Sequence, residues 1–408
     1  MTTNPSDYRF NFNAIRRALG APRFKSNRYT LYYIDDEPSS ITGELCVIRR
    51  SKLIELYKKA LDYAYDRLTQ PPIQMETPKT PPVIYLFNLR AWELRSYPCT
   101  IVTEDVCQVA LPSRTFLASD RAENEFDVAA AVHEMCHAIC FSQKHSSRCS
   151  GKPNWTWFYE GTSVWFETLL WDREAAKRAG LPVSRDGLHY ASDWCERTDR
   201  PLDSLEASYQ AFPFVSYLVV RFGQTLVGEI WREANPLVDP WDIITRRTSL
   251  SADNLFHDFC IQAYVLNDAN SPCHLPLVHK RFRGRAPTAR IRLQQGQSEF
   301  IEGTVRGLSC RYYCVILHDA IKQVTCELEG ADITGSAGFA TASLEASGNP
   351  VPLGATTIVP AVQARSPGHL FLTITGSAAL NRNVVSELQE IVKIAPGKTS
   401  FTIRLSAE

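Results

Sequence analysis

Two histidines four residues apart, with a glutamate directly after the first, are residues that can do chemistry together. They are His133, Glu134 and His137 in the segment HEMCH. On a helix, residues four apart point the same way, about 6 Å along the axis, so both imidazoles can reach one metal ion. Glu134 is then placed to meet a water at that ion. The segment lies in the apolar stretch AAAVHEMCHAIC, where unpartnered polar groups are costly, so the spacing predicts a metal site.

A catalytic zinc site needs a third protein ligand and one open position. The metzincin pattern is not met, because Cys140 and Gln143 stand where it has a glycine and a third histidine. Glu160 follows His137 by 23 residues in the aromatic segment WFYEGTSVWFE. A carboxylate among aromatic side chains needs a partner, and a zinc ion supplies one. Glu160 is therefore the predicted third ligand.

HEMCHAIC followed by WFYEGTSVWFE resembles the gluzincin superfamily of zinc metallopeptidases, which includes thermolysin and the aminopeptidase N-like enzymes. The resemblance covers residues 28–230, including the later stretch SYQAFPFVSYLVVRFG. It implies one catalytic zinc ion held by His133, His137 and Glu160, with Glu134 as the general base for a metal-activated water. The chain lacks the G-A-M-E-N motif and has no N-E-x-F-A around Glu160, so an aminopeptidase is not supported.

Three further side chains are candidates for supporting roles. The resemblance implies a tyrosine or histidine that stabilises the oxyanion; Tyr209, before Pro213, can take that role or a place in the core. For Tyr217, a packed core residue with a satisfied hydroxyl is favoured. Glu167 lies seven residues after Glu160, on the same helix face, where it can accept a hydrogen bond from a ligand imidazole. A surface position is nevertheless favoured for Glu167.

These residues predict metal-assisted hydrolysis of peptide bonds in a peptide or protein substrate. Two alternatives stay open: a zinc hydrolase that acts on another kind of bond, and a non-catalytic binding module stapled by zinc. Glu134 argues against the second, because a structural zinc site has no use for a general base. The physiological substrate, the choice between endo- and exopeptidase action and the oligomeric state are not readable from the sequence.

Two helices must position the candidate ligands, and hydrophobic periodicity predicts them at residues 125–141 and 155–171. In the first, Val128, Val132, Cys136 and Ile139 repeat every three to four residues, which indicates an amphipathic helix. The tryptophans of the second are expected to be core residues. The other predicted elements are strands at 28–36, 81–89 and 99–113, a helix at 52–68, and helices through 172–280, including one at 250–266 capped by Ser251 or Asp253.

The character of the sequence changes after residue 285. Short alternating runs such as VTCELEG and HLFLTITG, parted by Gly, Ser and Asn, predict an antiparallel β-sandwich. The expected fold class is α+β, with an N-terminal arm (1–27), a gluzincin-like metallopeptidase domain of a small sheet and helices (28–285), and an all-β sandwich domain (286–408). The role of the sandwich is not readable from its residues.

Composition restricts the partners. Lys+Arg and Asp+Glu are equal at 44 each, which does not indicate a nucleic acid as partner. No apolar run approaches the roughly 20 residues of a membrane helix, so no membrane partner is predicted. The N-terminus lacks the order of a signal peptide, so a cytoplasmic location is the default expectation, with secretion as the alternative. The 12 cysteines show no framework spacing and no C-x-x-C pair, which favours buried free thiols.

Overall fold

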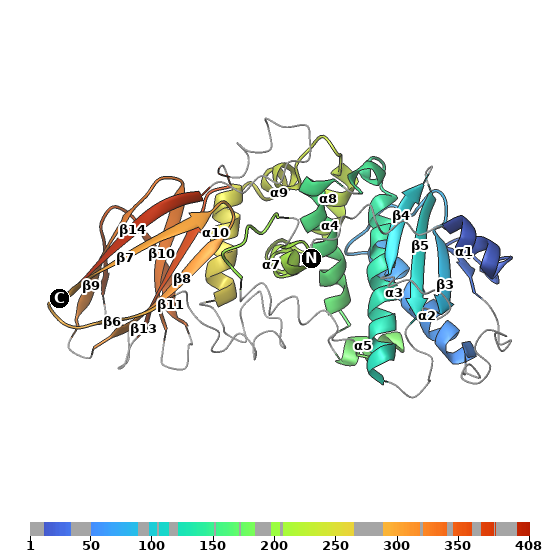
Figure 1. Ribbon diagram of the computed structural model, residues 1–408, viewed down its shortest axis with the longest axis horizontal. Coiled ribbons are helices and arrows are strands. Elements are labelled where there is room, and N and C mark those ends of the chain that lie inside the picture. Colours follow the sequence, from blue (N-terminus) through green and yellow to red (C-terminus); the bar gives the residue numbers. More distant parts are fainter. Residues whose placement is uncertain are drawn as a thin grey trace. The chain divides into compact units, whose positions relative to one another are not determined.

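The computed structural model describes residues 12–33, 50–88, 98–103, 106–113, 121–150, 152–170, 173–183, 197–204, 207–264, 289–318, 321–340, 346–360, 369–378, 380 and 398–408. Two compact units make up the chain: Met1–Gly187 with Phe222–Ile243, and Leu188–Arg221 with Ile244–Glu408. Their elements are labelled in Figure 1. The predicted boundary between residues 285 and 286 lies outside the described residues and stays a prediction.

A mixed five-stranded sheet, in the order β1-β2-β3-β5-β4, forms the base of the first unit. Parallel pairs join β2 to β3 and β3 to β5, whereas β1 and β4 are antiparallel to their neighbours. The predicted strands at 81–89 and 99–113 are confirmed, the latter as two strands, and only the start of the strand predicted at 28–36 is within the described residues. The bounds are β1 (Phe24–Lys25), β2 (Thr30–Tyr32), β3 (Val83–Asn88), β4 (Cys99–Thr103) and β5 (Val106–Ser113).

A helix and a short strand lie within residues 1–27, where the sequence predicted a loose arm. α1 (Phe12–Leu19) carries apolar residues at its two ends, seven positions apart and so on one helix face. Phe12 and Leu19 are buried in a cluster with Tyr32, Tyr85 and Ala110, and the Phe12 and Tyr85 ring centroids are 5.6 Å apart. The loose arm was predicted because residues 1–27 are mostly polar. The short apolar face of Phe12 and Leu19 nevertheless anchors α1 to the sheet.

α3 (Arg121–Phe141) lies on the face of the sheet opposite α1, as Figure 1 shows. It packs against β4, β5, α2 (Arg50–Thr69) and α4 (Pro153–Thr168). The helices predicted at 52–68, 125–141 and 155–171 are therefore confirmed. The amphipathic character expected of α3 is not: from Asp127 to Phe141 every side chain is buried except Ala130. Neighbours on several sides explain this, because a helix enclosed by other elements has no face left for solvent.

α4 begins at Pro153, whose fixed φ suits the first helical position. Its tryptophans Trp155 and Trp157 are buried, which confirms the core prediction for them. The Trp157 ring stacks on Trp241 at 5.2 Å, and the Trp155 ring lies 5.6 Å from Trp231 of α8 (Thr225–Glu233). Trp231 and Trp241 belong to the segment Phe222–Ile243, which returns to the first unit after residues 188–221 of the second. This segment covers α4. The remaining helices of this unit are η3 (Ser146–Cys149) and α5 (Arg173–Ala179).

The second unit combines helices with two sheets. Its helices are η5 (Tyr209–Ala211), α7 (Phe212–Phe222) and α10 (Ala252–Tyr264), while α9 (Pro240–Thr248) spans the division between the units. The sheets have the orders β11-β10-β13-β8-β6 and β12-β9-β14-β7. The strands are β6 (Ala289–Leu293), β7 (Ser298–Arg306), β8 (Cys310–Leu317), β9 (Gln323–Glu329), β10 (Ile333–Ala340), β11 (Ala346–Leu353), β12 (Thr357–Pro360), β13 (His369–Gly376) and β14 (Lys398–Ala407).

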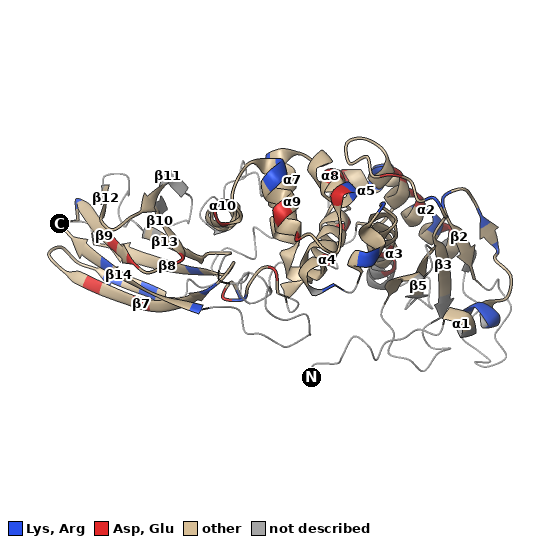
Figure 2. Ribbon diagram, turned by 90° about the horizontal axis from the view of Figure 1, so that it is seen from above, with Lys and Arg blue, Asp and Glu red and all other residues tan. Residues whose placement is uncertain are grey.

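The two sheets share one apolar core, as a sandwich requires. In β14, for example, Phe401, Ile403 and Leu405 point inward while Arg404 is exposed. The predicted antiparallel sandwich is confirmed except for β6 and β8, which pair in parallel. Figure 2 shows residues of both charge signs along β7, in keeping with the balanced composition.

α10 packs on β13 and β10 of the first sandwich sheet. Ser251 caps the helix by accepting the backbone N–H of Asn254 at 3.2 Å, as one of the two predicted caps. Asp253, the other candidate, instead accepts a hydrogen bond from the Ser377 hydroxyl at 2.9 Å and so ties the helix to the end of β13. Farther along α10, the Nδ1 atom of buried His257 lies 2.8 Å from the Thr375 hydroxyl of β13.

Acidification is expected to destabilise the second unit through His257. Burial lowers the pKa of His257 to about 4, against about 6.5 in an unfolded chain. Between these values the unfolded state binds the proton more tightly, so the free energy of unfolding falls as pH drops from 6.5 to 4, by about 3 kcal/mol in all. Urea denaturation followed by circular dichroism across this range measures the fall. His257→Gln should flatten the curve, and parallel curves for the two proteins would contradict the expectation.

Two further observations concern membrane-spanning helices and the state of the cysteines. Within the described residues, no helix has the length and apolar character that crossing a membrane requires. The nine cysteines described are free thiols, and all except Cys99 are buried.

Candidate metal centre

The centre is built on two consecutive helices. α3 supplies His133 and His137, whose side chains lie one turn apart and are 7% and 5% exposed as residues. Their Nε2 atoms are 3.0 Å apart. Since the whole of this part of α3 is enclosed, the imidazoles are held away from bulk water, and the four-residue spacing turns them toward one point.

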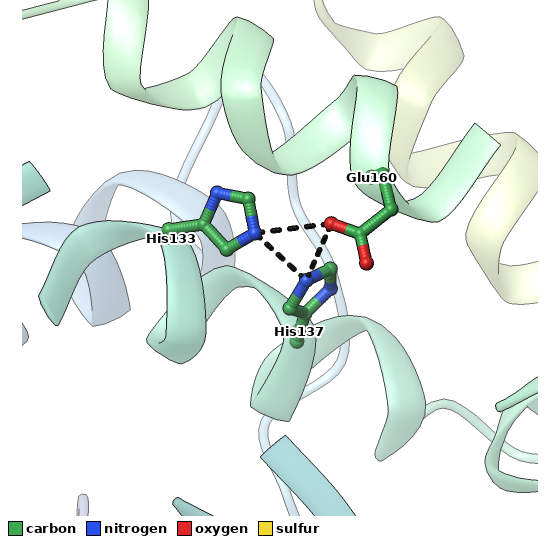
Figure 3. Close-up of side chains that lie close together, drawn as sticks. All are labelled: His133, His137 and Glu160. Carbon is green, nitrogen blue, oxygen red and sulfur yellow. Dashed lines mark hydrogen bonds and ion pairs between the residues drawn. The ribbon is translucent and has the colours of Figure 1, made fainter. Parts of the chain in front are cut away.

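α4 brings the third predicted ligand to the same point. The Oε2 atom of Glu160 lies 3.2 Å from Nε2 of His133 and 3.3 Å from Nε2 of His137. Figure 3 shows the three side chains converging from the two helices. Among the described residues, this is the group of three or more potential ligands close enough to hold a metal ion.

The spacing of these atoms fits a zinc ion. Tetrahedral zinc with bonds of about 2.0–2.1 Å separates its ligand atoms by about 3.3 Å. The three separations of 3.0, 3.2 and 3.3 Å are close to that value. Two imidazoles and a carboxylate are also a donor set found at catalytic zinc sites.

The charges around the centre favour a cation. Burial lowers the pKa of His133, but the hydrogen bonds and charges of Glu160 and Glu167 outweigh burial and raise it well above its usual range. For Glu160, burial acts to raise the pKa, yet the two imidazoles lower it to about 2. The carboxylates therefore attract positive charge to the point where the three donor atoms meet, and a divalent cation meets that demand.

Both ligand imidazoles are fixed by a second hydrogen bond at Nδ1. Glu167 Oε1 lies 2.6 Å from Nδ1 of His133, and Ser163 Oγ lies 3.1 Å from Nδ1 of His137. An ionised carboxylate only accepts, so His133 donates to Glu167 through Nδ1, and Nε2 is the ring nitrogen that would face a bound metal. The favoured surface position for Glu167 is wrong, because the residue is 5% exposed. No sequence motif singled out Ser163, although its place three residues after Glu160 puts it on the same helix face.

Removing the carboxylate behind His133 is expected to weaken zinc binding. In Glu167→Ala, Nδ1 of a buried imidazole loses its acceptor, and losses of about 10–100-fold in metal affinity are typical of such outer partners. Competition with a chromophoric chelator measures the dissociation constant. Glu174→Ala, which removes an exposed carboxylate of α5, is the matched control and should bind zinc as the wild type does. Equal affinity in both variants would show that Glu167 does not support the centre.

Glu134 lies beside the centre without being one of the three donors. It is 4% exposed, and its Oε2 accepts a hydrogen bond of 2.7 Å from the Thr100 hydroxyl of β4. Burial raises the pKa of Glu134, against the opposing effects of His137, His133 and the Thr100 hydroxyl. A buried carboxyl with a raised pKa next to a metal centre has the properties of a general base that later acts as an acid. No sequence pattern pointed to Thr100.

The two tyrosines named from the sequence belong to the second unit. Tyr209 begins η5 and is 38% exposed, so the role in stabilising an oxyanion stays a prediction. Tyr217 is fully buried in α7 and donates to Asp258 Oδ2 at 2.5 Å, while Arg221 donates to the Tyr217 hydroxyl at 2.8 Å. The core interpretation of Tyr217 is thus confirmed.

Comparison with known proteins gives a family match without an activity. Residues 119–267, which include all three candidate ligands, match the model of a family of unknown function, DUF6055. No curated protein matches the chain.

Solved structures that are similar in part are periplasmic inhibitors of g-type lysozyme named PliG. The protein from Aeromonas hydrophila has 13% identity and a TM-score of 0.21, and the match covers 29% of this chain and 96% of that protein. The protein from Salmonella Typhimurium has 9% identity and a TM-score of 0.19, and the match covers 29% of this chain and 98% of that protein. A PliG mutant from Escherichia coli gives 8% identity, a TM-score of 0.17, and coverage of 29% of this chain and 98% of its own. TM-scores this low support no conclusion about this chain.

Proposed function

We propose that the protein is a zinc-dependent metallopeptidase of the gluzincin type. The observation that carries the proposal is the meeting of His133, His137 and Glu160 at 3.0–3.3 Å, with the carboxyl of Glu134 beside them. Zinc, when bound, supplies Lewis-acid activation of water and of the substrate carbonyl. The centre would then belong to the gluzincin-like domain expected at residues 28–285, which includes residues of both units.

In this mechanism Glu134 moves the protons. It accepts one from the attacking water and passes it to the leaving amine, so that the same carboxyl acts as base and then as acid. Glu167 and Ser163 hold the two imidazoles in the tautomer that leaves Nε2 free for the metal. Tyr209 is the proposed residue for stabilising the oxyanion, and this part of the proposal rests on the sequence alone.

A peptide is favoured as substrate by the position of β4. Among the described strands of its sheet β4 is outermost, and its residue Thr100 touches Glu134. An extended peptide can add to the edge of a sheet through main-chain hydrogen bonds. Such a strand added at β4 would run beside the general base, whereas an ester without a peptide backbone could not use this edge.

The test combines metal analysis with a substrate screen. Mass spectrometry of the purified protein should find about one zinc per chain. Quenched fluorescent peptides should be cleaved, a chelator should stop cleavage, and added zinc should restore it. No zinc after repletion would overturn the proposal. Cleavage of ester or acyl substrates but not peptides would favour the hydrolase of another bond, and tightly held zinc without any hydrolysis would favour the stapled binding module.

A further inference from the structure

Thr100 is directed at α3 by its place in β4. Its neighbours Cys99 and Ile101 pack on the apolar cluster that contains Phe12 of α1. Because side chains alternate along a strand, Thr100 points to the other face of the sheet, where α3 lies. The antiparallel register agrees with this direction. It pairs Thr100 with Val109 of β5, which lies on the same face of the sheet as Cys107, two residues earlier in β5. Cys107 donates to the Ala138 carbonyl of α3, so this face is the one that α3 covers.

The hydroxyl of Thr100 has two acceptors, and both belong to one residue. Oγ1 lies 2.7 Å from Oε2 of Glu134 and 3.0 Å from the main-chain oxygen of Glu134. A hydroxyl carries a single hydrogen, so Thr100 donates to one of these atoms at a time. Turning about the Cβ–Oγ1 bond transfers the donation from one to the other without moving the backbone.

This choice matches the two states that a general base must pass through. When Glu134 is ionised, the charged Oε2 is the stronger acceptor, and Thr100 holds it in a charge-assisted hydrogen bond. That leaves Oε1 as the oxygen for proton transfer. Once Oε1 carries the proton, Oε2 loses its charge, and the main-chain oxygen becomes a comparable acceptor for the same hydroxyl hydrogen. With either oxygen as its partner, the hydroxyl hydrogen of Thr100 keeps an acceptor.

We propose that Thr100 is a positioning residue: its hydroxyl holds Oε2 of Glu134 and so assigns proton transfer to Oε1. The inference rests on the proposed metallopeptidase function. The proton that moves in the reaction goes from water to Oε1 and then to the leaving amine, while the hydrogen of Thr100 stays on Oγ1 throughout. The branched Cβ restricts the side chain to few rotamers, which keeps Oγ1 in place between the two acceptors.

The test compares T100V with T100S in the zinc-loaded full chain. Valine has the shape of threonine without the hydroxyl, and kcat is expected to fall by about 10–100-fold, the range of a hydrogen bond to a charged group. KM, zinc content and melting temperature should stay near the wild-type values. Serine returns the hydroxyl and should bring kcat to within about 3-fold of the wild type. Should T100V lose stability or zinc, T100C replaces it, because a thiol is a weak donor and should give an intermediate kcat.

T162V is the matched control. Thr162 of α4 is also buried, and its hydroxyl donates at 2.6 Å to the Phe158 carbonyl, a main-chain group of the same helix. Its loss should leave kcat unchanged. Wild-type kcat in T100V, or equal losses in T100V and T162V, would overturn the role of Thr100 and leave the proposed function standing. A zinc-loaded wild type that hydrolyses no peptide would overturn both.

Discussion

Glu134→Gln is expected to lower kcat for peptide hydrolysis by about 10²–10⁴-fold while zinc content stays at the wild-type level. Glutamine keeps the length and shape of the side chain, and its amide oxygen can still accept the hydrogen bond that Thr100 makes at 2.7 Å. The amide has no basic oxygen, however, and cannot take a proton from water. Glu134 is not one of the three grouped donors, so the metal should stay bound.

This experiment needs kcat and zinc content from the same preparation. Saturating substrate removes any effect on binding, and mass spectrometry gives the metal. Glu174→Gln makes the same chemical change at an exposed position of α5 and should behave as the wild type. Hydrolysis by Glu134→Gln at a near wild-type rate would show that another group takes the proton, and the proposed mechanism would be wrong.

Glu160→Ala should have the largest effect on the metal. It removes the atom that lies 3.2 and 3.3 Å from the two imidazole nitrogens and reduces three donors to two. Zinc affinity is expected to fall by more than about 100-fold, the upper end of the loss caused by removing an outer partner. Because a ligand that binds only the folded state stabilises it, the wild type should also gain thermal stability when zinc is added, and Glu160→Ala should not.

Two measurements separate loss of zinc from loss of fold. Circular dichroism of the metal-free proteins should be the same for Glu160→Ala and the wild type, since α4 owes its place to buried aromatic side chains such as Trp157 and Phe158. Glu160→Gln keeps the size of the side chain but not its charge, and it should also bind zinc weakly. If Glu160→Ala retains about one zinc per chain after dialysis against a mild chelator, the third ligand is a different group.

The elements and residues that the sequence predicted are those whose signal is local. HEMCH and Glu160 lie on two neighbouring helices, and helical spacing alone decides which side chains share a face. The strands of the sandwich were readable for the same reason, because alternation along one strand needs no knowledge of its partners.

What the sequence did not predict depends on contacts between distant segments. Thr100 meets Glu134 across 34 residues, and a single threonine in a strand carries no sign of that partner. Glu167 looked like a surface residue because burial of a carboxylate becomes favourable only once His133 is seen beside it. The packing of α1 was not predicted for the same reason, because the burial of Phe12 depends on its contact with Tyr85 of β3. The parallel pairing of β6 with β8 is a matter of topology rather than of residue pattern.

The order in which the two units use the chain has a consequence for biosynthesis. All three donor residues have been synthesised once Glu160 is made, but α8, which covers α4 with Trp231, comes only after the first stretch of the other unit. At about 5–20 residues per second, the nascent chain exposes the ligand-bearing helices for on the order of ten seconds before their last covering segment, ending at Ile243, is available. During this interval a metal ion can reach the histidines freely, and so can chaperones and proteases.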